Sequence, residues 1–297
     1  MKSYLLAIFS SGGYALWAIF AYLAIVTFLA VSFIITQFAI VALSLVLTVM
    51  LMVVRREKFR PEKGVLKYGA LQGLAWSAGT MVYFYEFHNA AAFPLTTAAA
   101  SLSLILFAWF IRKTNNSREG FIYFTATIAA AVGIFLQAYA VYGAGFSLGT
   151  SYLLLLPLIA VFYAVGTLFE YRPMHENDSP MSVAVVMWVF YTIFIALATT
   201  VLGGWDTVGR ITAAYVGYIV AAAVVVVLAF LAELYSFEIA RKAEAAVIDT
   251  INIITTVDFG TLAFSLIFLV NLKLPLFAGG ALLIAALVLL TKIGGRE

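Results

Sequence analysis

Residues 29–53 read LAVSFIITQFAIVALSLVLTVMLMV and contain no Lys, Arg, Asp or Glu, and the run ends just before Arg55 and Arg56. A helix needs roughly 20 apolar residues to cross a hydrocarbon layer about 30 Å thick. A run of this length and composition, bounded by charged residues, therefore predicts a membrane-spanning helix.

Apolar runs of this kind fill almost the whole chain. Of its 297 residues, 65% are hydrophobic and 10% are charged, whereas an ordinary soluble domain has roughly 25% charged residues. The connections are short, and no Pro/Ser-rich linker divides the chain. The first run lacks a clear small-residue cleavage site, so we expect it to be retained as a helix. We predict an all-α integral membrane protein, a single membrane domain with ten transmembrane helices at residues 4–25, 29–53, 64–87, 92–112, 120–141, 148–170, 181–202, 211–237, 245–270 and 273–293.

Positive charge is divided unequally between the two ends of these helices. With Lys67 counted in its adjacent loop, every Lys and Arg except Arg210 and Lys273 lies at the end that holds both termini. Because Lys and Arg resist translocation, both termini are predicted to be cytoplasmic. The net charge of +3 then reflects topology and attraction to anionic lipid headgroups. No basic patch suggests a nucleic-acid partner, and we expect a multi-pass protein in the plasma (inner) membrane of a prokaryote.

Two pairs of similar segments indicate an internal repeat. Tyr4-Leu5-Leu6 in the first predicted helix precedes Tyr152-Leu153-Leu154 in the sixth by 148 residues, and Tyr83-Phe84-Tyr85 in the third precedes Tyr235-Ser236-Phe237 in the eighth by 152. An odd number of helices per copy gives the two copies opposite orientations, with a site between them near the membrane midplane. We predict two inverted five-helix repeats, at residues 1–146 and 147–297.

Several stretches of the chain resemble one family. They are Gly13-Tyr14-Ala15-Leu16-Trp17-Ala18 in the first predicted helix, Phe162-Tyr163-Ala164-Val165-Gly166 in the sixth, and the closing pair of helices from Asp258-Phe259-Gly260 to Gly279-Gly280-Ala281. In these features the chain resembles the EamA-type, ten-span members of the drug/metabolite transporter superfamily. It departs from that pattern at Asp258, where the family usually has proline, and at Asn271, where it often has glutamate. The resemblance implies the ten-helix fold and transport, but no particular substrate.

The third predicted helix has a polar and aromatic stripe. Its members are spaced four and three residues apart, which places them on one face, and such a face is unsuited to lipid. The stripe consists of Gln72, Trp76, Gly79, Tyr83 and Glu86. Gly69, Gly73 and Ser77 form an adjacent row of small residues that suits close packing against another helix. Glu86 and His88 lie near the outer end of this helix, where hydration at the interface is the alternative to a binding role.

The first and sixth predicted helices each have a similar polar and aromatic face. Ser10, Tyr14 and Trp17 share one face of the first, and Tyr163, Thr167 and Glu170 share one face of the sixth. If the halves meet as the resemblance implies, the aromatic rings would line a pocket for an aromatic or cationic solute. The alternative is anchoring at the membrane interface, which Trp and Tyr also serve. We predict a substrate site formed by Tyr14, Trp17, Gln72, Trp76, Tyr83, Glu86, Tyr163 and Asn252.

Two aspartates lie in the ninth predicted helix. Asp249 shares a face with Asn252 and Thr256, whereas Asp258 points to the opposite face. A carboxyl group in the membrane interior is costly and can exchange protons, so Asp258 and Asp249 are predicted coupling residues for a proton gradient. The alternatives are a structural hydrogen bond for Asp258 and a polar helix-start role for Asp249.

The sequence therefore predicts a secondary transporter of a small organic metabolite, such as an amino acid or amine, that works by alternating access and is not an enzyme. The alternatives are a channel, a lipid or conjugate flippase of the same fold and, more remotely, a lipid-modifying enzyme within the membrane. HExxH, DDxxD-like and Walker motifs are all absent from the sequence, as are cysteines. We expect no metal or cofactor. Direction and substrate stay open, and a homodimer is allowed.

Overall fold

The computed structural model describes residues 2–88, 150–175, 179–240 and 274–294, together with isolated positions at 121, 122, 125, 126, 128, 129, 132, 133, 136, 248 and 251. Throughout this part of the chain the secondary structure is helical, with no strand. The elements are α1 (Lys2–Thr27), α2 (Phe33–Val54), α3 (Lys63–His88), α6 (Thr150–His175), α7 (Pro180–Val201), the 3-10 helix η2 (Gly204–Arg210), α8 (Ala213–Ile239) and α10 (Leu274–Gly294).

Seven of the predicted helices correspond to these α-helices within a few residues at each end. The all-helical prediction is therefore confirmed for the described residues. The predicted helix at 92–112 lies outside them. Those at 120–141 and 245–270 fall within them only at isolated positions, which are helical.

Four helices are long and apolar enough to cross a membrane: α1, α2, α7 and α8. Their length and composition support an integral membrane protein. The α3 helix is equally long but more polar, and it packs against α2, α6 and α7 inside the bundle.

The helices begin and end at residues suited to these positions. Thr212 precedes α8, and its side chain accepts a hydrogen bond from the Tyr215 backbone N–H, which satisfies one of the unpaired donors of the first turn. Pro180 opens α7, where its missing N–H costs nothing. After α7 the chain turns at Gly203, whose φ of 68° is a left-handed conformation that glycine adopts without strain.

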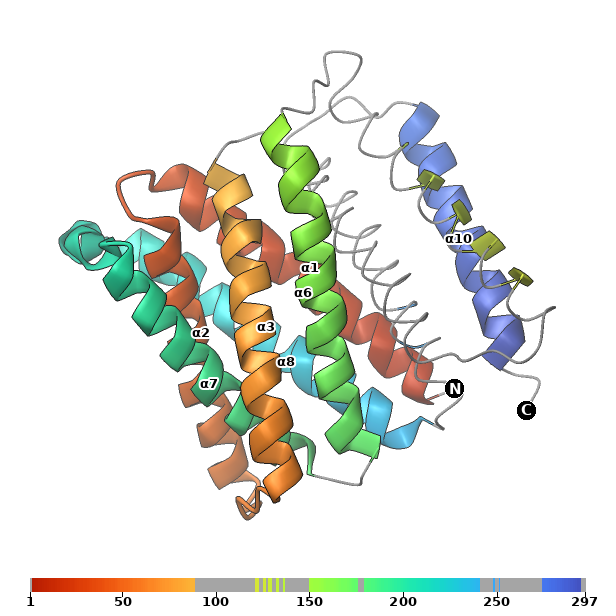
Figure 1. Cartoon of the computed structure of the whole chain (residues 1–297), viewed down its shortest axis with the longest axis horizontal. Helices are drawn as coiled ribbons and strands as arrows, with labels where there is room; N and C mark the ends of the chain where they lie inside the picture. The colour runs from red at the N-terminus through yellow and green to blue at the C-terminus, as the bar shows by residue number, and fades with distance from the viewer. Residues whose placement is uncertain are drawn as a thin grey trace.

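The described helices pack side by side, with α1 and α8 passing behind α3 and α6 (Figure 1). α1 lies along α8, α3 lies between α6 and α7, and α2 packs on α7 and α8. Glycines allow the closest approaches. A Cβ added at Gly13 would lie 2.7 Å from the Ala229 Cβ, and one added at Gly73 would lie 2.9 Å from the Tyr191 backbone nitrogen. The small-residue row predicted on α3 is thus a packing edge, and its partner is α7.

Contacts between loops define the two ends of the bundle. At one end, the Arg210 side chain donates to the Ala30 carbonyl and the Ser32 backbone N–H donates to Thr207. At the other end, Arg55 lies over the Tyr235 ring with 5.5 Å between its guanidinium carbon and the ring centroid. α1 and α3 begin, and α6 and α10 end, toward this second end (Figure 1).

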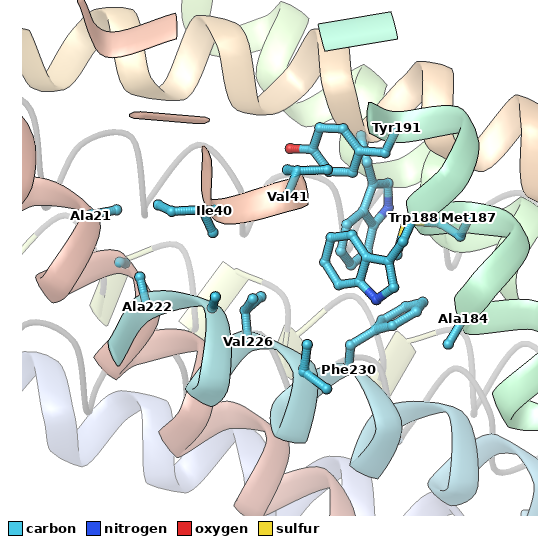
Figure 2. Close-up of a cluster of buried hydrophobic side chains, with 14 of the residues drawn as sticks. Ala21, Ile40, Val41, Ala184, Met187, Trp188, Tyr191, Ala222, Val226 and Phe230 are labelled. Atoms are coloured by element: carbon cyan, nitrogen blue, oxygen red, sulfur yellow. The ribbon is translucent and has the colours of Figure 1, made fainter. Parts of the chain in front are cut away.

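Aromatic side chains fill the centre of the bundle. Trp188 of α7 packs edge-on against Phe230 of α8, with ring centroids 5.5 Å apart, and stacks on Tyr191 at 5.9 Å. Figure 2 shows these three rings pointing inward from α7 and α8, beside Val41 of α2. This core holds α7 against the helices that carry the candidate site.

Candidate functional site

Five aromatic side chains from α1, α3 and α6 form a closed ring. Following the ring from Tyr14 to Trp17, Tyr83, Tyr163, Trp76 and back to Tyr14, successive ring centroids are 6.4, 6.1, 6.5, 6.2 and 6.3 Å apart. Four of the contacts are edge-to-face and the contact of Trp17 with Tyr83 is stacked, which are the arrangements that aromatic pairs favour. We call these five residues the aromatic ring of the site.

The position of Trp76 in this ring depends on a glycine of the neighbouring helix. A Cβ added at Gly166 would lie 2.0 Å from the Trp76 Cδ1 atom and 2.3 Å from its Nε1 atom. Such distances are shorter than any van der Waals contact, so only glycine at this place in α6 leaves room for the indole. Gly166 thereby positions Trp76 against Tyr163.

Two buried glutamates lie beside the aromatic ring. The Tyr14 hydroxyl donates to Glu233 Oε2 of α8 at 2.5 Å, and Gln72 Nε2 donates to Glu170 Oε2 of α6 at 3.0 Å. Glu170 also interacts electrostatically with Tyr14. The exposed fraction is 4% for Glu233 and zero for Glu170. Because burying a carboxyl group is costly without polar partners, both glutamates mark a place of functional interest in the interior of the helical bundle.

Several buried polar atoms in the described part of the chain have no hydrogen-bond partner there. Four of them lie on the faces of α1 and α3 that carry the site: Ser10 Oγ, Trp17 Nε1, Gln72 Oε1 and Trp76 Nε1. Most buried polar atoms in proteins are hydrogen-bonded, so unpaired ones call for an explanation. Trp17 and Trp76 each therefore hold an N–H donor, and Gln72 holds an oxygen acceptor, that is not used by the described residues.

A second polar cluster connects the ring to α2 and α7. Gln37 Nε2 donates to the Tyr191 hydroxyl at 3.0 Å and to the Ser77 backbone oxygen at 3.3 Å. The Thr80 side-chain oxygen, three residues further along α3 than Ser77, lies 3.4 Å from the Tyr163 hydroxyl. Tyr163 therefore belongs both to the aromatic ring and to this polar cluster.

The structure brings together most of the residues predicted from sequence. Six of them lie in one place: Tyr14, Trp17, Gln72, Trp76, Tyr83 and Tyr163. That they bind a substrate stays a prediction. Glu86 belongs to α3, but its side chain lies outside the described residues, as do Asp249, Asn252 and Asp258.

Sequence reasoning missed three residues of the site: Glu233, Gln37 and Tyr191. For Glu233 a signal existed, since an acidic residue inside an otherwise apolar run is itself a functional pointer. Gln37 is a single amide in an apolar helix, and its partner Tyr191 is 154 residues away in the sequence. No local pattern could have paired them.

No protein-family model matches the chain, and no curated protein matches it in sequence. Its fold is nevertheless similar to one known from crystallography: the two structures superpose with a TM-score of 0.71 at 13% sequence identity, covering 98% of each chain. At this identity the similarity concerns the fold alone.

Proposed function

We propose that the protein is a secondary transporter of a small organic solute, and that the solute binds at the aromatic ring between α1, α3, α6 and α8. The observation that carries the proposal is the meeting, deep in an apolar helical bundle, of five aromatic rings and two buried glutamates. Polar groups placed at this depth in membrane proteins characteristically serve transported solutes or ions.

The pattern of helix packing supports two inverted repeats. Exchanging α1 with α6, α2 with α7 and α3 with α8 converts each observed packing into another observed one: α1 on α8 becomes α6 on α3, and α2 on α8 becomes α7 on α3. The packing of α2 on α7 is unchanged by the exchange. We propose ten spans in two inverted halves with cytoplasmic termini, as in the drug/metabolite transporters that the sequence resembles. Such a plan favours alternating access.

The chemistry of the site favours an aromatic or amine-bearing solute. Ring faces attract cations and stack on aromatic groups, and Glu170 and Glu233 offer acceptors for an ammonium group. Proton coupling through Asp258 or Asp249 belongs to the same proposal and places a titratable carboxyl group on the solute path.

Counterflow in proteoliposomes tests the proposal. Vesicles loaded with about millimolar unlabelled solute are diluted into a trace of the same labelled solute, for a panel of aromatic and polar amino acids, quaternary amines, nucleosides and sugars. An alternating-access carrier accumulates label transiently above equilibrium, because binding sites return loaded from the inside. A channel equilibrates the label without an overshoot. If none of the solutes in the panel produces an overshoot, the proposal is contradicted.

A further inference from the structure

Two hydrogen bonds supply donors to the buried carboxyl groups at the aromatic ring. The Tyr14 hydroxyl lies 2.5 Å from Glu233 Oε2, and the Gln72 side-chain nitrogen lies 3.0 Å from Glu170 Oε2. An ionised carboxylate can only accept hydrogen bonds, so the hydroxyl and the amide are the donors. Both donors are neutral and belong to α1 and α3, whereas the carboxyl groups belong to α8 and α6. Each bond therefore joins a helix of the first predicted repeat to a helix of the second.

The two carboxyl groups are covered on the side of the aromatic ring. The exposed fraction is 4% for Glu233 and zero for Glu170, so an incoming group reaches them only if their neighbours move. Tyr14 is itself a member of the aromatic ring, with its ring centroid 6.3 Å from that of Trp76. Gln72 lies about one helical turn before Trp76 on α3. A solute bound at the aromatic ring therefore lies next to both donors.

Charge decides which molecules can compete with these donors. A hydrogen bond between an ammonium group and a carboxylate is stronger than one from a neutral donor, so an ammonium group displaces a hydroxyl or an amide with a net gain. A neutral aromatic molecule brings no stronger donor than those already in place. If it pushed them aside, a buried carboxyl group would lose a hydrogen bond, which is costly.

We propose that Tyr14 and Gln72 hold the place of the solute's ammonium group, which displaces them from Glu233 and Glu170 when the solute binds. The site therefore selects organic cations in which an ammonium group is joined to an aromatic or apolar body, and it excludes neutral aromatic molecules. Tyr14 and Gln72 are specificity-determining residues, because they bind the glutamates in competition with the solute. This inference rests on the proposed binding site but not on transport, since it concerns affinity alone.

Competition predicts that removal of either donor strengthens the binding of amines. Tyr14→Phe keeps the aromatic ring but has no hydroxyl, so an ammonium group no longer has to displace that hydroxyl from Glu233. The affinity for an amine should rise about tenfold, as expected for one hydrogen bond to a charged group. Gln72→Met should have the same effect at Glu170. A side chain that only packs in the site, or that contacts the solute directly, would instead lower the affinity when it is altered.

Binding of amines and of a neutral counterpart tests the competition. The amines are 2-phenylethylamine, tyramine and tryptamine, and the counterpart is benzyl methyl ether, which matches 2-phenylethylamine in its number of non-hydrogen atoms but has no hydrogen-bond donor. Affinities for the full-length, detergent-purified protein are measured by isothermal titration calorimetry. In wild type at least one amine should bind about tenfold more tightly than the ether. In Tyr14→Phe and Gln72→Met that amine should bind about tenfold more tightly still, with little change for the ether.

Two control variants leave the glutamates and their donors intact. Tyr85→Phe makes the same chemical change as Tyr14→Phe at an exposed side chain. Ser44→Ala removes a buried hydroxyl that donates to the Ile40 carbonyl of its own helix. Neither control should raise the affinity for amines. Melting temperatures identify the folded variants, and Gln72→Met tests the inference if Tyr14→Phe does not fold.

Three outcomes overturn the inference: no amine binds to wild type, the amines bind no more tightly than the ether, or the folded variants bind amines with unchanged or lower affinity. The last result would mean that the ammonium group binds beside the two donors and not in their place. Counterflow that succeeds for wild type while any of these holds would remove the inference and leave the transporter standing. Tighter amine binding by Tyr14→Phe and Gln72→Met without counterflow of any solute would do the reverse.

Discussion

At the residue scale, the contact between Trp76 and Gly166 makes a direct prediction. Gly166→Ala places a methyl group 2.0 Å from the indole, so either the ring or α6 has to move. Overpacking of this kind costs about 1–3 kcal/mol. We expect a lower melting temperature in detergent and a shifted tryptophan emission spectrum.

The matched control is Gly217→Ala in α8, where an added Cβ meets nothing within 4 Å. It should be neutral or slightly stabilising, because alanine favours helix more than glycine does by about 1 kcal/mol. Combining Gly166→Ala with Trp76→Leu should recover much of the lost stability. Equal melting temperatures for wild type and Gly166→Ala would show that the space left by Gly166 is not required for packing of the Trp76 indole.

The hydrogen bond between Tyr14 and Glu233 gives a second prediction at this scale. Tyr14→Phe removes a donor from a buried carboxyl group, and the loss of a hydrogen bond to such a group costs about 1–3 kcal/mol. Thermal unfolding should therefore begin at a lower temperature than in wild type. Tyr85→Phe, at a side chain that is 48% exposed, should unfold like wild type, and a Tyr14→Phe protein as stable as this control would speak against the bond.

For the site, the spacing of residues in the sequence predicted which side chains share a face of one helix. Tyr14 and Trp17 share a face of α1, and Gln72, Trp76 and Tyr83 share one of α3, because residues three, four and seven apart align on a helix. Spacing within one helix does not indicate which helices face each other, so the hydrogen bond between Gln37 and Tyr191 could not be predicted from the sequence. Glu233 could have been predicted as a site residue, since it interrupts an apolar run.

At the element scale, two adjacent glycines of α1 allow a controlled comparison. A Cβ at Gly13 would lie 2.7 Å from the Ala229 Cβ of α8, whereas one at Gly12 meets nothing within 4 Å. Gly13→Val should therefore push α1 away from α8 and lower the melting temperature strongly. Gly12→Val should be neutral or slightly stabilising, because valine favours a helix somewhat more than glycine does, and a similar loss of stability in both variants would contradict this packing.

Helix positions were the part of the fold most accessible from sequence. Apolar runs bounded by Arg55 and Lys63 or by Pro180 define where the chain can remain in hydrocarbon, and α2, α3 and α7 begin and end close to those residues. The short helix η2 was not expected. It lies in the connection between α7 and α8, where neither apolar periodicity nor a long run indicates helix.

At the scale of the whole molecule, the sidedness of the loops can be tested by labelling. The chain has no cysteine, so each introduced thiol is unique. Lys58→Cys lies in the exposed loop between α2 and α3, and Gly209→Cys lies on exposed η2. In intact cells a membrane-impermeant maleimide should label the Gly209→Cys variant alone. Inverted vesicles should give the opposite result, and labelling of both variants from one side would refute the topology.

The central claim is that the aromatic ring and its glutamates form the transport site, and counterflow by Glu233→Gln in proteoliposomes tests it most directly. Glutamine keeps the size of the side chain and an acceptor for Tyr14, so the variant should fold while its affinity for a cationic solute falls. With the solute that wild type accumulates, we predict that the overshoot disappears in Glu233→Gln and persists in the matched control Glu57→Gln, at a partly exposed loop position where Glu57 pairs with Arg55. An unchanged overshoot in folded Glu233→Gln would place the transport site elsewhere.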